Sequence, residues 1–118
     1  MSKNNNYAEQ TADKKIVSAK EYIDANFADT TLSVTALAEQ AGTSDVYFRK
    51  LFKKIYRMSP SQYIISARIK TAKKLLHYSF LTLEECSIQS GFSSIQYFCR
   101  VFKRETGMTP SEYKNEAF

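Results

Sequence analysis

Apolar residues recur three and four positions apart along most of this chain, which is the spacing that places side chains on one face of an α-helix. In the segment from Lys14 to Asn26 they are Ile16, Ala19, Tyr22 and Ile23. A second clear case runs from about Ser44 to Tyr56, with apolar residues at positions 48, 51, 52 and 55. The pattern predicts amphipathic helices, each with one buried face.

Capping residues divide the first half of the chain into a short helix, a turn and a longer helix. Ser33 can cap a helix that runs through Ala41, and Gly42 follows where a left-handed backbone would end it. Ser44 then starts the longer helix, which reaches about Tyr56. A short helix, a tight turn containing glycine and a longer helix make a helix-turn-helix.

The second half shows the same signals. The capping box Thr-Leu-Glu-Glu opens a helix over 83–90, and Gly91 ends it. The next helix begins near Ser93 or Ser94 and ends before Gly107. A second helix-turn-helix is therefore expected.

These two units are copies of each other. Positions 47–63 align with 97–113 at an offset of 50, and eight of the seventeen aligned residues are identical. Upstream, 37–42 aligns with 86–91 at an offset of 49, so the second copy has one extra residue in its turn. Internal similarity of this length indicates a duplicated structural unit.

Two Ser/Thr-Pro pairs open the remaining helices. Ser59-Pro60 starts a helix that ends near Tyr78, and Thr109-Pro110 starts a short final one. We therefore expect an all-α fold of seven helices, in which two helix-turn-helix subdomains are joined by a long linker helix. The expected divisions are a mobile polar segment at 1–13, a first subdomain at 14–57, a linker helix at 58–78 and a second subdomain at 79–118.

Composition narrows the function. The 118 residues include one histidine, His77, and two cysteines, Cys86 and Cys99, so one chain cannot build a multi-histidine metal site. With no glycine-rich phosphate loop either, we expect no enzymatic activity, no cofactor and no metal. Two cysteines without metal-ligand spacing favour a reducing compartment. Short apolar runs and a polar start predict a cytoplasmic protein without a membrane partner.

Charge points to the partner. Seventeen Lys and Arg residues against twelve Asp and Glu residues give a net charge of +5, which favours a polyanion. In the second helix of the first unit, an apolar stripe that must face the core is formed by Phe48, Leu51, Phe52 and Ile55. The same positions in the second unit are Phe98, Val101, Phe102 and Glu105. The opposite faces carry Val46, Arg49, Lys50 and Lys53, and Gln96, Cys99, Arg100 and Lys103. Two duplicated basic faces of this kind suit insertion in the major groove of double-stranded DNA.

The linker helix has a suitable length for this role. From Ser61 to Tyr78 it would span about 27 Å at the rise of an α-helix, and one turn of B-DNA advances by about 34 Å. A single chain could therefore bind two half-sites about 10 bp apart without dimerising.

The chain resembles the DNA-binding domain of the AraC/XylS family of bacterial transcription regulators. The motifs that carry the resemblance lie between about residues 14 and 115: Leu37-Ala38, Gly42-Thr-Ser44, Tyr47-Phe48-Arg-Lys-Leu-Phe52-Lys53, Ser59-Pro60, Arg68-Ile69, Gly91-Phe92, Tyr97-Phe98, Arg100-Val-Phe102-Lys103 and Gly107-Met-Thr-Pro110-Ser-Glu-Tyr113. The resemblance implies two helix-turn-helix subdomains that bind an asymmetric promoter site, usually as an activator, with RNA polymerase as a partner. It leaves open whether an N-terminal sensor or receiver domain precedes this chain in a longer protein.

Carried over by position, the resemblance implies a set of residues that contact DNA bases. They are Val46, Arg49 and Lys50 in the first unit, and Ile95, Gln96, Cys99 and Arg100 in the second. Helix N-termini and flanking cations are the candidates for backbone phosphates: Ser44, Lys53, Lys54, Ser93, Ser94, Lys103 and Arg104. Arg68 is expected to brace the subdomains.

Three positions depart from the family pattern. Arg57 stands where the family and the second copy have glycine, so the first unit's longer helix is expected to end differently. Cys86 and Ser87 replace aliphatic and small residues, with Cys86 expected as a small buried side chain.

If Ser93 is the N-cap, Gln96 completes a capping box and is less available to a base.

Other functions fit the sequence less well. A helical protein-interaction module without base contacts is the alternative, and it would tolerate charge reversal at Arg49 and Arg100. An RNA-binding surface would place aromatic rings on an open face, whereas most aromatics here fall on core positions.

Overall fold

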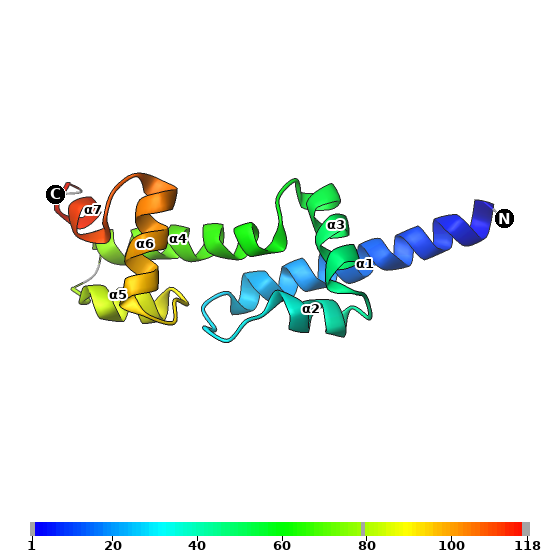
Figure 1. The fold of residues 1–118 in the computed structure, drawn as a ribbon, viewed down its shortest axis with the longest axis horizontal. Helices are drawn as coiled ribbons and strands as arrows, with labels where there is room; N and C mark the ends of the chain where they lie inside the picture. Colours follow the sequence, from blue (N-terminus) through cyan, green and yellow to red (C-terminus); the bar gives the residue numbers. More distant parts are fainter. Residues whose placement is uncertain (1, 79, 117–118) are drawn as a thin grey trace. The chain divides into compact units, whose positions relative to one another are not determined.

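The computed structural model describes residues 2–78 and 80–116, and within these ranges the chain is all-α (Figure 1). It forms seven helices: α1 (Ser2–Asn26), α2 (Val34–Gln40), α3 (Asp45–Tyr56), α4 (Pro60–Tyr78), α5 (Leu83–Gln89), α6 (Ile95–Thr106) and α7 (Pro110–Glu116). The predicted fold class is confirmed. The described residues divide into a first unit, made of those up to Asn26 and 32–64, and a second unit, made of 27–31 and those from 65 onward.

Helix α1 is longer than the apolar spacing predicts. It begins at Ser2 rather than at Lys14, so most of the polar segment at 1–13, which was expected to be mobile, is helical. Residues 2–13 lack an apolar stripe, but they also contain no glycine or proline that would stop a helix from extending toward the N-terminus. Without an apolar periodicity, a segment has no face to bury against the core, but its residues can still form a helix.

The first unit has the caps that its sequence indicates. Ser33 Oγ accepts a hydrogen bond from the Ala36 amide at 3.1 Å, and Ser44 Oγ accepts one from the Tyr47 amide at 3.2 Å. Gly42 has φ of +71°, the left-handed conformation expected after the short helix. The helix-turn-helix of α2 and α3 is therefore confirmed.

The second unit has the same organisation, and it settles the position of one cap. Ser94, not Ser93, is the N-cap of α6, because Ser94 Oγ accepts a hydrogen bond from the Tyr97 amide at 3.1 Å. Thr82 caps α5 through the Glu85 amide at 3.1 Å. The extra residue of the second copy therefore lengthens the turn before Ser94 and leaves the start of α6 equivalent to that of α3.

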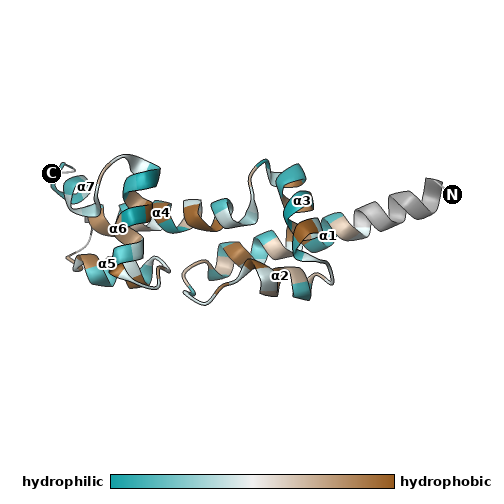
Figure 2. Cartoon of the chain, viewed as in Figure 1, coloured by the Kyte–Doolittle hydropathy of each residue, from teal (hydrophilic) through white to brown (hydrophobic). Residues whose placement is uncertain are grey.

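Each unit is built around aromatic residues of its longer helix. Phe48 and Phe52 in the first unit, and Phe98 and Phe102 in the second, are fully buried. The duplication extends to ring contacts: Phe52 meets Tyr63 edge to face with centroids 5.6 Å apart, and Phe102 meets Tyr113 in the same way at 5.4 Å. Burial of each phenylalanine contributes about 1.5–3 kcal/mol, so these rings fix how each longer helix is rotated. Hydrophobic and hydrophilic stretches accordingly alternate along α6 in Figure 2.

The start of α4 is fastened to α1 by a polar cluster in the first unit. Tyr63 Oη donates a hydrogen bond to Asp24 Oδ1 at 2.6 Å, and Lys20 Nζ lies 2.7 Å from Asp24 Oδ2. Partial burial raises the pKa of Asp24, but the hydrogen bonds from Lys20 and Tyr63 outweigh burial, and the pKa is lowered overall. The charged form of Asp24 is therefore the one that the first unit favours.

In the second unit, Arg68 of α4 holds the segment that follows α1. Its Nε donates to the Phe27 carbonyl at 2.7 Å, and its NH2 group donates to the Asp29 carbonyl at 3.0 Å. Burial lowers the pKa of Arg68, while Tyr97 and Asp29 act to raise it. The sequence assigned Arg68 a bracing role, and its observed partners are backbone carbonyls of 27–31.

Arg57 ends α3 in the same way that Gly107 ends α6. Arg57 is left-handed with φ of +64° and ψ of +14°, and its amide bonds the Lys53 carbonyl. Gly107 has φ of +83° and bonds the Lys103 carbonyl. The expectation that α3 would end differently is wrong, because the remainder of the turn holds the arginine in a conformation that suits glycine.

We expect Arg57→Gly to raise the free energy of unfolding by about 1 kcal/mol. Relief of the left-handed strain, about 1–2 kcal/mol, is partly offset by the greater freedom of glycine in the unfolded chain. Denaturant unfolding would measure the change. Arg57→Ala is the control, since it removes the side chain and keeps the strain; an equal gain from both variants would contradict the explanation.

One buried hydroxyl lacks a partner. Ser87 is fully buried in α5, and its Oγ makes no hydrogen bond to any residue that the structure describes. The aligned residue of the first unit is Ala38, which is also fully buried. Cys86 next to it is buried as expected.

We expect Ser87→Ala to stabilise the protein by about 1 kcal/mol, since it removes a polar group that was desolvated without a hydrogen bond. Thermal unfolding would show the gain. The reverse change, Ala38→Ser, places a hydroxyl at the equivalent site of the first unit and should destabilise by a similar amount. Loss of stability in Ser87→Ala would mean that the hydroxyl is satisfied in solution.

Candidate nucleic-acid interface

The face of α3 opposite its buried phenylalanines is open. Val46 is 76% exposed, which is unusual for an aliphatic side chain with a core nearby. Arg49, Lys50 and Lys53 are exposed on the same side of the helix. None of these three cations forms an ion pair with a residue in the described ranges. This face of α3 therefore offers both positive charge and an apolar contact.

The corresponding face of α6 is open at its polar residues. Gln96, Arg100 and Lys103 are exposed, and neither cation forms an ion pair within the described part of the chain. Ile95, at the first position of the helix, is half-buried. On this face of α6, the polar side chains are therefore more accessible than the aliphatic one.

Because Ser94 is the N-cap of α6, Gln96 is not part of a capping box, as it would be if Ser93 were the cap. A capping box pairs the N-cap with the third residue of the helix, which in α6 is Tyr97. Gln96 is the second residue and is exposed. Its amide is therefore not required by the helix start.

Cys99 is less accessible than its position on the open face suggests. It is half-buried and packs against the core of the second unit, which contains Phe98 and Phe102. Only part of this side chain could meet a ligand. The equivalent residue of the first unit is the exposed Arg49, so the two faces differ in chemistry at this position.

The residues expected to meet phosphates lie at both ends of these helices. Ser44 and Ser94 are occupied as N-caps, and Ser93 is exposed just before α6. The cations of the last turns are all exposed: Lys53, Lys54, Lys103 and Arg104. Arg104 Nε also lies 3.3 Å from Glu105 Oε2. Cations at a helix C-terminus favour the helix dipole as well, so their charge serves the fold in addition to any ligand.

Tyr97 supports this face of α6, although the sequence marked it only as part of the motif Tyr97-Phe98. The Arg100 guanidinium carbon lies over the Tyr97 ring, 5.6 Å from its centroid. The two residues are three positions apart on α6, which places them on adjacent turns of one face. The signal that could have found it is this spacing of an arginine after an aromatic residue.

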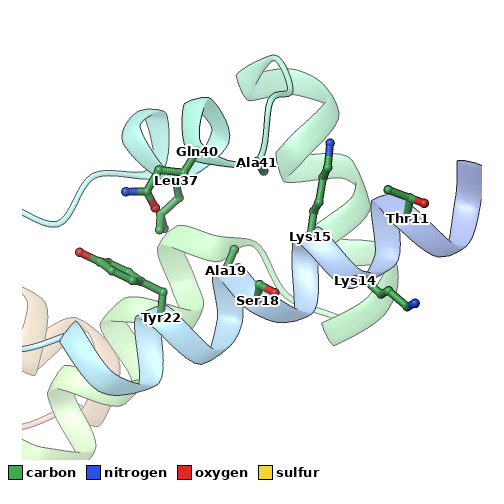
Figure 3. A pocket seen from close by; sticks show the side chains of 9 residues that line it. All are labelled: Thr11, Lys14, Lys15, Ser18, Ala19, Tyr22, Leu37, Gln40 and Ala41. Atoms are coloured by element: carbon green, nitrogen blue, oxygen red, sulfur yellow. The ribbon is translucent and has the colours of Figure 1, made fainter.

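A hollow of about 430 Å³ lies in the first unit between α1 and α2 (Figure 3). Lys15 extends along it toward the turn at Gly42, and the rest of the lining comprises Lys14, the Tyr22 ring, and hydroxyl, amide and aliphatic groups. The lining has no carboxylate, thiol or imidazole, so it offers no acid–base pair. Among the described residues, no group of three His, Cys, Asp or Glu side chains could hold a metal ion, and none of the described helices is long and apolar enough to cross a membrane.

Comparison with known proteins identifies relatives in transcription. A family model described as a helix-turn-helix domain matches residues 37–116. The HTH-type transcriptional activator RhaR of Salmonella dublin is 37% identical over 91 residues, which are 77% of this chain and 32% of that protein. The chain thus spans about a third of the length of this curated relative. The relatives are regulators rather than enzymes.

Solved structures share the fold. The C-terminal domain of AraT, a response regulator from Geobacillus stearothermophilus, has a TM-score of 0.82 at 25% identity, over 86% of this chain and 84% of that one. A transcriptional regulator with an AraC-type DNA-binding domain from Chromobacterium violaceum has a TM-score of 0.72 at 26% identity, over 88% of this chain and 92% of that one. The arrangement of seven helices is therefore that of known DNA-binding domains.

Proposed function

The chain belongs to the AraC/XylS family of helix-turn-helix DNA-binding domains, and from this membership we propose that it binds a specific double-stranded DNA sequence in the major groove and regulates transcription there. One observation carries the proposal. In each unit, buried phenylalanines turn the longer helix so that cations without ion pairs within the described residues are exposed on its far side. We call α3 and α6 the recognition helices.

The exposed side chains have the chemistry that base edges require. Arg49, Lys50 and Arg100 can donate to guanine O6 and N7, and Gln96 can pair with adenine N6 and N7. Val46, and the accessible parts of Ile95 and Cys99, can contact a thymine methyl. These contacts supply sequence preference, because major-groove edges distinguish all four base pairs.

Phosphate contacts supply most of the affinity. The four cations of the last turns, Lys53, Lys54, Lys103 and Arg104, and the helix starts at Ser44, Ser93 and Ser94, are the groups assigned to the backbone. Their charge does not distinguish sequences, so they position the recognition helices and leave selectivity to the base contacts.

The bound site is asymmetric. The duplicated helices differ at positions assigned to base contacts: Arg49 and Lys50 in α3 align with Cys99 and Arg100 in α6. Because the two units carry different side chains, the two half-sites must differ in sequence. We also propose that one chain binds half-sites about 10 bp apart, which is about one turn of B-DNA.

The activity belongs to a larger regulatory system. RhaR is named a transcriptional activator and is about three times as long as the aligned segment. We therefore assign this chain the DNA-binding role of an activator that works in the cytoplasm with RNA polymerase as its protein partner, under control of an N-terminal sensor or receiver domain when it occurs in a longer protein.

Selection of binding sites from random duplexes, followed by a salt titration on the selected site, tests the proposal. Neutralisation of about six phosphates should make log K fall with log salt at a slope near −5. A slope near zero, or no enrichment of any sequence, would overturn DNA binding. Protection of only about 5 bp per chain in a footprint would overturn the use of two half-sites.

A further inference from the structure

Arg100 does not extend freely from α6. Its guanidinium carbon lies 5.6 Å from the centroid of the Tyr97 ring, within the range of a cation–π attraction. An exposed arginine otherwise samples many rotamers, and binding must restrict them at an entropic penalty. A guanidinium that already rests on a ring has lost part of this freedom before DNA arrives.

The ring of Tyr97 is itself held in place. It packs at 47° against Phe92 with centroids 5.8 Å apart, and Phe92 is 2% exposed in the core of the second unit. Tyr97 also packs against the buried cluster of the second unit, which includes Phe98 and Val101. The ring under Arg100 is therefore anchored to the buried apolar core of the second unit.

The first unit has the equivalent residues without this arrangement. Tyr47 aligns with Tyr97, and Lys50 aligns with Arg100. Tyr47 is 49% exposed, and among the described residues no cation lies over its ring. The duplication has thus produced one recognition helix with a supported cation and one without.

We propose that Tyr97 is a positioning residue for sequence recognition: its ring orients Arg100 for one base contact, so that α6 enters the groove preorganised and α3 adapts to its half-site. The inference rests on the proposed function and assigns a specificity role to a residue outside the set assigned to base contacts. Preorganisation of this kind increases discrimination between sequences more than general affinity, because only the correct base can form hydrogen bonds with a guanidinium held in this orientation.

Two Tyr97 variants and one matched control separate the possible roles of the ring. Tyr97→Phe keeps the ring and removes the hydroxyl, whereas Tyr97→Leu removes the ring and keeps apolar bulk. Tyr47→Leu makes the same change in the first unit. In the free protein, nuclear magnetic resonance should show ring-current shifts on the Arg100 side chain in the wild type and in Tyr97→Phe, and their loss only in Tyr97→Leu.

Binding then tests the recognition role. At the base pair whose preference Arg100→Ala relaxes, Tyr97→Leu should reduce discrimination by about two- to five-fold, while Tyr97→Phe and Tyr47→Leu leave it unchanged at that pair. In the Arg100→Ala background, Tyr97→Leu should have no further effect on that preference. The slope with salt should not change, since no phosphate contact is removed.

The outcomes distinguish this inference from the function on which it rests. A wild-type protein that selects no sequence would overturn both. Sequence selection by the wild type with undiminished discrimination in Tyr97→Leu, or an equal loss in Tyr97→Phe, would overturn the positioning role alone. Circular dichroism of each variant, together with its affinity for non-specific DNA, separates a folding defect from a change in recognition.

Discussion

Gly91→Ala is expected to lower the free energy of unfolding by about 2–5 kcal/mol, more than the same change at Gly42 or Gly107. Gly91 has φ of +102°, where a residue with a β-carbon is strained. A β-carbon there would lie 2.4 Å from the Phe27 carbonyl oxygen and 2.9 Å from the Ala28 Cα. Both neighbours are backbone atoms, so the 27–31 segment would have to move.

Gly107→Ala is the matched control for this prediction. Gly107 also has a positive φ, +83°, but a β-carbon at this position would have no described heavy atom within 4 Å. Only the conformational penalty of about 1–2 kcal/mol remains. Equilibrium denaturation of both variants measures the difference. Equal losses of unfolding free energy would show that the close approach of the Phe27 carbonyl to residue 91 does not contribute to the effect.

Arg49→Ala and Arg100→Ala should each weaken binding to the selected DNA site by about 1–3 kcal/mol and relax sequence preference in different half-sites. Each change removes a cation that is exposed on its recognition helix, and neither removes a buried contact. Competition binding with single-base variants of the site would map each loss to its base pairs.

The matched control for these variants is a cation outside the recognition helices. Lys74→Ala removes an exposed lysine of α4 and should leave base preferences unaltered. If Arg49→Ala and Arg100→Ala weakened all duplexes equally, the two arginines would be phosphate contacts. If both relaxed the same half-site, the assignment of one half-site to each unit would be wrong.

The duplicated architecture could be predicted from the sequence because its signals are local. Caps such as Ser33 and Ser44 act within one turn of helix, and a phenylalanine pair four residues apart on an amphipathic helix has only one way to be buried. Exposure of the basic faces follows from the same periodicity. The DNA contacts of individual residues stay predictions.

What the sequence did not reveal depends on contacts between distant segments or on a choice between similar neighbours. Ser93 and Ser94 are equally good caps, and the backbone selects the second. Arg57 adopts a conformation that its own side chain disfavours, because the turn requires it. The support of Arg100 by Tyr97 needs the rotation of both side chains, which periodicity alone does not specify.

The assignment of 27–31 to the second unit has a consequence for protein engineering. The chain passes from the first unit to the second at Asn26, returns at Leu32 and passes again within α4. A fragment that starts at Ile65 would lack the 27–31 segment. The carbonyls of this segment accept hydrogen bonds from Arg68, and its backbone lies against Gly91. A chimaera that replaces the second unit by that of a homologue must therefore exchange both 27–31 and the residues from 65 onward. Truncation at residue 65 alone would leave the groups that contact 27–31 without their partners.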